Sequence, residues 1–313
     1  DRIDADVSST LAGNGSGSVD VDVAVLDTGV DSDHPDLNVA GGVSCTAGAG
    51  DFEDGNGHGT HVAGTIAAKD DAVGVVGVAP GARIWAARVL NAGGFGSFAS
   101  VICGVDWATG TRTDADPTND IEVANMSLSG GGSDDGNCGA DNGDAFHAAI
   151  CNSVEAGVTY AVAAGNAARD FQTSVPAAYD EVLTVTAVSD FDGKPGALGS
   201  PTCRSDEDDT FANFSNFGSD VDIIAPGKCI WSTYPGARFA YMSGTSMAAP
   251  HVSAIAALVI ATGKLGPDPS PDLVQTHIQT TARDLGKPGV DGRYGFGLVD
   301  AAAALRCLPP TVC

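Results

Sequence analysis

Basic residues are scarce in this sequence. Lys and Arg number 15 and Asp and Glu number 40, which gives a formal net charge of −25 at pH 7. A field of that sign repels polyanions, so we expect no nucleic-acid partner and no binding to anionic membranes. It favours divalent cations and cationic substrates, with the solubility of an acidic surface as the simpler explanation.

Long apolar runs, internal repeats and Pro- or Ser-rich linkers are also lacking. The most apolar stretch, 254–261, is shorter than the roughly 20 residues that a membrane-spanning helix needs, so we expect no membrane segment. With 43% hydrophobic residues and no linker, the chain is expected to form one domain over 1–313. It begins at Asp1, and we expect a signal peptide and a pro-segment to have been removed ahead of it.

The cysteines include no Cys-x-x-Cys pair, which argues against zinc ribbons and thioredoxin-like redox chemistry. Their even number, 8, favours up to four disulfides in an oxidising, extracellular compartment. Sequence order leaves the pairing open, and free buried thiols are the alternative. Short loops favour Cys307–Cys313 and Cys138–Cys151, then Cys203–Cys229, which leaves Cys45–Cys103 by elimination.

Short β-branched runs alternate with helical patterns along the chain. This alternation is typical of an α/β fold in three layers, with a mostly parallel central sheet and helices on both faces. The expected strands are 21–26, 84–89, 121–126, 158–163, 182–188 and 221–225, and the expected helices are 60–68, 98–109, 144–156, 247–262, 271–282 and 298–305.

Polar side chains stand where three of these strands end. Asp27 follows the first strand, Asn125 and Ser127 close the third, and Asn166 follows the fourth. In open parallel sheets, ligands bind outside the carboxyl ends of the strands. We therefore expect these groups to lie along one edge of the sheet.

Ser246 stands directly before the long apolar helix. Ser is a common N-cap residue, so capping is the simplest interpretation of this position alone. The same position lies beside free backbone N–H groups and the positive end of the helix dipole, which can stabilise an oxyanion next to the hydroxyl. The segment is not the Gly-x-Ser-x-Gly turn of α/β-hydrolases, because residue 248 is Ala.

A serine nucleophile needs a base, and His58 lies in a Gly-flanked turn where a helix begins. His61, one turn further on, is expected to pack inside. The pair lacks the spacing of His-Glu-x-x-His, so we expect no zinc site there. Asp27, in Asp-Thr-Gly, could orient the base, whereas an aspartic protease would need a second such motif.

The segments 27–29, 58–64 and 244–250 together resemble the signature motifs of the subtilisin-like serine proteases. Their order, Asp then His then Ser, is also the order of that family. The resemblance extends over residues 3–305 and implies a subtilisin-like fold and the hydrolysis of peptide bonds.

The resemblance assigns a role to each polar residue of the expected edge. It implies that Asp27 orients the base, that His58 is the general base and acid, and that Ser246 is the nucleophile. Asn166 matches the side chain that stabilises the oxyanion together with the Ser246 backbone N–H. Two other functions compete with this one: a catalytically silent binding protein, and an esterase or ligase that uses the same acyl-enzyme.

The resemblance also implies that a substrate binds as an extended strand between the segments 93–96 and 125–129. With Met126, Leu128 and no fixed charge nearby, the primary pocket is expected to prefer large apolar or aromatic side chains before the cut. The expected substrate contacts are Gly94, Phe95, Gly96, Phe98, Ser127, Leu128 and Ser129.

The loop 69–75 resembles the family loop that binds structural calcium through one side chain and several backbone carbonyls. At its N-terminus the chain is shorter than the family pattern, which normally supplies a further ligand there. No organic cofactor is expected. The expected calcium ligands are Asp36, Lys69, Asp71, Val73 and Val75.

These features predict a secreted, monomeric serine endopeptidase of broad specificity. By the same resemblance, it is made as a zymogen whose pro-segment serves as a folding aid and inhibitor.

Overall fold

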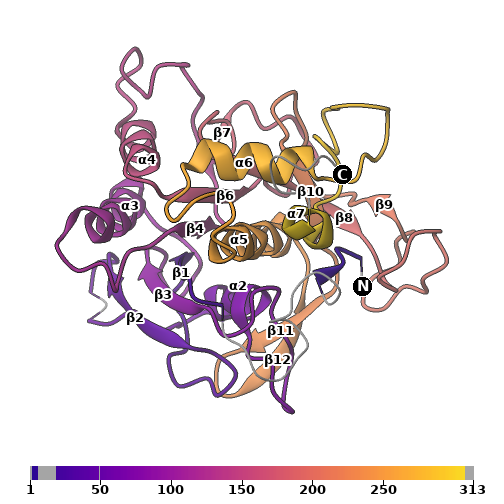
Figure 1. Ribbon diagram of the computed structural model, residues 1–313, viewed down its shortest axis with the longest axis horizontal. Coiled ribbons are helices and arrows are strands. Elements are labelled where there is room, and N and C mark those ends of the chain that lie inside the picture. The colour runs from indigo at the N-terminus through magenta and orange to yellow at the C-terminus, as the bar shows by residue number, and fades with distance from the viewer. Residues whose placement is uncertain (1, 6–18, 49, 307–313) are drawn as a thin grey trace.

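A mostly parallel sheet forms the centre of the computed structural model, which describes residues 2–5, 19–48 and 50–306 (Figure 1). The strands lie in the order β10-β8-β6-β4-β1-β3-β2, and each neighbouring pair in this order is parallel. β9 pairs with β8 in the antiparallel sense. The strands are β1 (Asp22–Asp27), β2 (Val39–Ser44), β3 (Arg83–Arg88), β4 (Val123–Met126), β6 (Thr159–Ala163), β8 (Leu183–Ser189), β9 (Thr210–Phe211) and β10 (Ile223–Pro226).

Helices cover both faces of this sheet, which confirms the expected fold class (Figure 1). Alternate residues of β1 face different cores: Val23 and Val25 pack with α2, α5, α6 and α7, whereas Ala24 and Leu26 pack with α3 and α4. Strands buried on both faces explain the continuous apolar runs of the sequence. The helices are α2 (His58–Ala67), α3 (Phe98–Thr113), α4 (Ala145–Glu155), α5 (Thr245–Ala261), α6 (Pro271–Thr280) and α7 (Ala301–Arg306).

Two antiparallel pairs outside the main sheet were not expected from the sequence. β11 (Ile230–Tyr234) pairs with β12 (Arg238–Met242), and β5 (Gly130–Gly131) pairs with β7 (Ser174–Val175). The sequence pattern misses β5 because its two glycines carry no side chain that could show a period. Its partner β7 is equally short, so backbone pairing alone defines this pair.

The start of α2 depends on two glycines that allow close packing. Gly57 adopts φ +107°, and a Cβ on it would lie 2.3 Å from the ring of Tyr234. A Cβ on Gly59 would lie 2.1 Å from the carbonyl oxygen of Gly29. Because both positions lack side chains, α2 approaches the end of β1 and begins at His58, two residues before the expected start.

Three disulfides join cysteines that are 58, 13 and 26 residues apart in the sequence. The structure bonds Cys45 to Cys103, Cys138 to Cys151 and Cys203 to Cys229, in agreement with the expected pairs. The expected pair Cys307–Cys313 lies outside the described residues. Within the part of the chain that the structure describes, no helix has the length and apolarity to cross a membrane.

Candidate active site

A carboxylate and an imidazole meet at the end of β1. Asp27 is fully buried at the last position of that strand, and His58 is the first residue of α2. The Nδ1 atom of His58 lies 2.8 Å from Oδ1 and 2.9 Å from Oδ2 of Asp27. Since an ionised carboxylate only accepts, Nδ1–H donates, and the lone pair of the neutral ring is at Nε2.

The environment of His58 favours its protonated form. Burial lowers the pKa of His58, but the charge of Asp27 and its hydrogen bond, with a further contribution from Asp54, raise it above its ordinary value. His61 and His251, the other two histidines of this region, have lowered pKa values instead. Burial lowers the pKa of His61 to about 4 and that of His251 to about 4, so both are neutral, packed side chains.

Ser246 occupies the first turn of α5, next to the end of β4. Its hydroxyl donates to the carbonyl oxygen of Ser127 at 3.3 Å, and the carbonyl oxygen of Ser246 accepts from the Ser127 hydroxyl at 2.8 Å. Among the described contacts, no hydrogen bond joins Ser246 to His58, although both line the same cleft. Catalytic hydrogen bonds of this kind are often long without a substrate.

The side chain of Asn166 is held in one orientation by the start of α5. Its Oδ1 accepts from the backbone N–H of Thr245 at 2.8 Å and from the Thr245 hydroxyl at 3.0 Å. A backbone N–H must donate, so this atom is the oxygen and the amide nitrogen is free to donate into the cleft that Asn166 lines.

Asp54 is a positioning residue that the sequence analysis did not identify. Its Oδ1 accepts from Gly57 N at 2.8 Å and from the hydroxyl of Thr28 at 2.9 Å. Its Oδ2 accepts from Thr60 N at 3.0 Å and the Thr60 hydroxyl at 2.6 Å. Asp54 thus ties the first turn of α2 to the residue after Asp27. An Asp four positions before His58, at the start of a helix, was the available signal.

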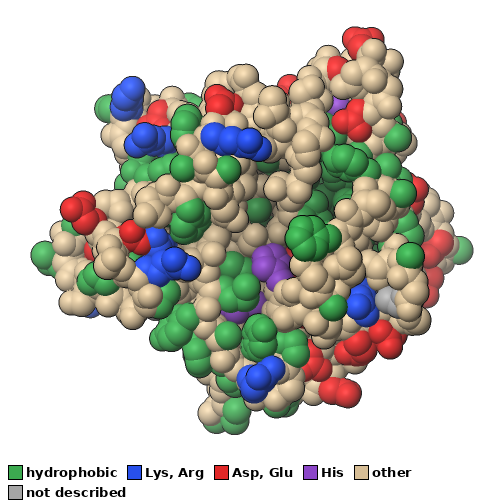
Figure 2. All heavy atoms as spheres, turned by 180° about the vertical axis from the view of Figure 1, so that it is seen from behind, with side chains coloured by type: hydrophobic (Ala, Val, Ile, Leu, Met, Phe, Trp, Pro, Cys, Tyr) green, Lys and Arg blue, Asp and Glu red, His purple; other side chains and the backbone are tan. Residues whose placement is uncertain are grey.

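The expected substrate contacts all line one cleft of about 630 Å³, together with His58, Asn166 and Ser246. Among the described residues that line it, His58 has the sole ionisable side chain. Met126, expected beside the primary pocket, does not line the cleft; it is fully buried in the core beneath. Figure 2 shows acidic side chains around much of the periphery of this face, most densely at its lower right, with histidine and hydrophobic side chains in its middle.

An aromatic residue from α4 also lines the cleft and was missed. The ring of Phe146 lies 5.7 Å from that of Phe98 and 5.8 Å from that of Tyr179. Phe146 and Val175 therefore extend the apolar wall that Phe98 and Leu128 begin. On sequence alone, Phe146 is one of several apolar residues of a helix, and nothing marks it as facing a cleft.

The loop 69–75 folds around Asp36. Lys69 N donates to the backbone oxygen of Asp36 at 2.9 Å, and Val75 N donates to its Oδ2 at 3.1 Å. The other carboxylate oxygen, Oδ1, is buried without a hydrogen-bond partner. Burial raises the pKa of Asp36, although the Val75 hydrogen bond opposes this, and the charge of Asp71 raises it further. An orphaned buried oxygen beside a second carboxylate fits a bound cation.

A serine hydroxyl, an imidazole and a buried carboxylate at the edge of a parallel sheet define the class of serine hydrolases. The family model described as Subtilase family matches residues 18–297, and the chain belongs to that family. It is a serine endopeptidase.

Curated relatives agree with this assignment. Subtilisin Savinase of Lederbergia lenta is 39% identical over 306 residues, which cover 97% of this chain and 97% of that protein. M-protease of Shouchella clausii is 39% identical over the same length and is covered to 68%. The thermostable alkaline protease of Halalkalibacterium halodurans is 40% identical over 284 residues, which cover 91% of this chain and 67% of the relative.

Proposed function

We propose that this serine endopeptidase cleaves peptide bonds through an acyl-enzyme on Ser246. The observation that carries the proposal is the pair of 2.8 and 2.9 Å contacts that hold His58 Nδ1 on Asp27, in the cleft that Ser246 lines. With Nδ1 fixed, Nε2 is the atom that takes the hydroxyl proton of Ser246 as its oxygen attacks the carbonyl carbon.

The amide N–H of Asn166 and the backbone N–H of Ser246 then stabilise the oxyanion of the tetrahedral intermediate. His58 returns its proton to the leaving amine, which frees the C-terminal product and leaves an ester on Ser246. Water attacks this ester, with His58 again as the base, and releases the N-terminal product. Asp27 stays ionised throughout and stabilises the imidazolium.

Labelling with a phosphonylating inhibitor tests this assignment. We expect a single adduct, which peptide mapping by mass spectrometry places on Ser246, and none in the Ser246→Ala variant. That variant should keep the circular dichroism spectrum of the parent and lose about 10⁶ in kcat, the loss measured when the same residue of subtilisin is removed. An adduct on another residue would disprove the assignment.

For specificity, we propose a preference for large apolar or aromatic side chains before the cut. The absence of any Asp, Glu, Lys or Arg among the described residues that line the cleft supports it, as does the apolar wall of Leu128, Phe98 and Phe146. A panel of chromogenic peptides that differ at this one position measures kcat/KM for each. Preference for Arg or Asp there would contradict the proposal.

We also propose that Asp36 and Asp71 bind Ca²⁺ with backbone carbonyls of Lys69, Val73 and Val75, because Asp36 Oδ1 is buried without a partner. Bound calcium would neutralise the two carboxylates and stabilise the loop.

Secretion is supported by the disulfides, which persist in oxidising compartments. The pro-segment and the monomeric state stay predictions.

A further inference from the structure

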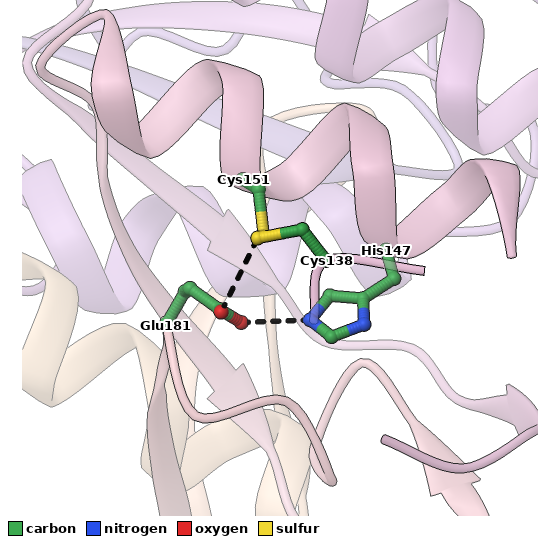
Figure 3. Close-up of side chains that lie close together, drawn as sticks. All are labelled: Cys138, His147, Cys151 and Glu181. Atoms are coloured by element: carbon green, nitrogen blue, oxygen red, sulfur yellow. Dashed lines mark hydrogen bonds and ion pairs between the residues drawn. A yellow bond between two sulfur atoms is a disulfide. The ribbon is translucent and has the colours of Figure 1, made fainter. Parts of the chain in front are cut away.

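A buried histidine outside the catalytic cleft is surrounded by carboxylates. His147, in the first turn of α4, is fully buried, and its ring stacks on Tyr179 with centroids 4.0 Å apart and planes 3° apart. Figure 3 shows Glu181 and the Cys138–Cys151 disulfide on one side of this ring, with the second ring nitrogen facing away from them.

The two ring nitrogens of His147 have different surroundings. Nε2 lies 2.8 Å from Oε2 of Glu181, so Nε2–H donates to that carboxylate. Nδ1 is buried and has no hydrogen-bond partner, yet it lies 3.4 Å from Oδ1 of Asp135 and 3.6 Å from Oδ1 of Asp134. A neutral ring therefore directs a lone pair at two carboxylate oxygens. A cation between the three atoms would turn this repulsion into attraction.

We propose that Nδ1 of His147 and the Oδ1 atoms of Asp134 and Asp135 bind a divalent transition-metal ion, with Zn²⁺ as the expected ion. These three atoms lie within 4.8 Å of one another. Ligands at about 2.0–2.1 Å from a tetrahedral zinc are about 3.3–3.4 Å apart. The Nδ1 atom lies at that distance from Asp135, 3.4 Å, and slightly further from Asp134, 3.6 Å. An imidazole nitrogen with carboxylate oxygens suits zinc and its neighbours, whereas calcium takes oxygen ligands.

Neighbouring side chains and backbone N–H groups fix the orientation of these ligands. Glu181 fixes the ring orientation and leaves Nδ1 as the coordinating atom, in the carboxylate–histidine–metal arrangement common around zinc. Backbone N–H groups of residues 137 and 139 donate to Oδ1 of Asp135, and those of residues 141 and 142 donate to its Oδ2, so the carboxylate is held in one orientation beside the ring. The side chain of Asp134 is 18% exposed, which leaves room for water as a fourth ligand.

The disulfide excludes the opposite side of the ring as the metal site. Cys138 and Cys151 lie near His147 and Glu181, but their sulfurs are bonded to each other and Nε2 already donates. A metal on the Nδ1 side would clamp the loop before α4 to that helix. Phe146, adjacent to His147, lines the substrate cleft, so the clamp would also support the apolar end of that cleft. The proposal does not depend on the catalytic assignment.

Metal titration of the full chain tests the site. The Ser246→Ala variant is used so that the protein does not digest itself; it is stripped with EDTA, desalted and supplied with excess Ca²⁺ to fill any calcium site. We expect isothermal titration with Zn²⁺ to show a single equivalent bound despite the calcium. Co²⁺ in its place should show the visible absorption bands of a tetrahedral site with a nitrogen ligand.

Variants then locate the ion. His147→Gln and Asp134→Asn should abolish Zn²⁺ binding, and Glu181→Gln should weaken it about 10–100-fold, because Glu181 acts through the histidine. Asp141→Asn removes the same charge from an exposed position of the same loop and should bind as the parent does. Circular dichroism and a thiol assay check that each variant is folded with its disulfides closed.

Three results would overturn the proposal. The first is no Zn²⁺ uptake by the parent protein, as expected if a proton occupies Nδ1 instead. The second is unchanged affinity in folded Asp134→Asn and Glu181→Gln proteins. The third is binding that appears only after reduction and is lost in Cys151→Ser, which would place the metal on the sulfur side of the ring.

Discussion

Replacing Asn166 by Leu removes the side-chain N–H proposed to hold the oxyanion and keeps a side chain of similar size at the cleft. In subtilisin, loss of the matching donor costs about 10²–10³ in kcat, or about 2.7–4 kcal/mol. We expect a fall in that range here, with little change in KM, because the donor acts on charge that develops in the transition state.

The hydrogen bonds of Asn166 predict a second, separate effect on stability. Its Oδ1 accepts from Thr245 N and the Thr245 hydroxyl, so Leu leaves two donors unpaired at the start of α5. This loss should lower the free energy of unfolding by about 1–3 kcal/mol. Thr245→Val is the matched control: it keeps the amide of Asn166 and removes the hydroxyl that bonds both Asn166 and Gly165 N. Its kcat should fall less than that of Asn166→Leu.

Steady-state kinetics with a chromogenic peptide measure kcat and KM of both variants. Urea denaturation of the inhibitor-blocked proteins measures the free energy of unfolding. An Asn166→Leu enzyme with the kcat of the parent would refute the assigned donor. So would a Thr245→Val enzyme that loses as much kcat as Asn166→Leu, because orientation rather than the N–H itself would then account for the loss.

Three further predictions concern the base, its helix and the calcium loop. His58 in its neutral form is the proposed base and Asp27 raises its pKa, so kcat/KM should rise with pH through that pKa. Asp27→Asn should cost about 10⁴ in kcat and move this acid limb of the pH–rate profile to lower pH. An unmoved limb would contradict the assignment. Asp54→Ala removes the acceptor of five donors around the start of α2 and should lower the free energy of unfolding by about 1–2 kcal/mol. Urea denaturation measures this change, and a variant as stable as the parent would contradict the prediction. After EDTA treatment and desalting, calcium should raise the melting temperature of the inhibitor-blocked parent. Asp36→Asn treated in the same way should not respond to calcium, and a parent without any response to calcium would exclude the calcium proposal.

Much of the fold follows from local sequence patterns. The alternation of buried strands and helices predicts the parallel sheet, and the six expected strands all lie in it with ends displaced by at most two residues. Strands β2 and β9 of the same sheet, the β5–β7 pair and the β11–β12 hairpin were missed. A two-residue glycine strand has no hydrophobic period, and its pairing depends on where the flanking chain is held.

The candidate site shows the same division. Asp27, His58, Asn166 and Ser246 could be named from motifs, because each chemical group stands at a recognisable strand or helix end. The residues that position these four side chains could not be named from the sequence. Asp54 accepts hydrogen bonds from Thr28, which follows Asp27, and from Thr60, which follows His58, and these contacts form once α2 packs against β1.

The sequence by itself determined which chemical groups this protein carries and in which local element each one lies, since side-chain identity and periodicity are local properties. The tertiary structure alone decided which of these groups meet. It brings the acidic loop of Asp134 and Asp135 against His147, turns Phe146 toward the substrate cleft and leaves one oxygen of Asp36 unpaired. Contacts of this kind depend on packing between distant segments, which no local pattern encodes.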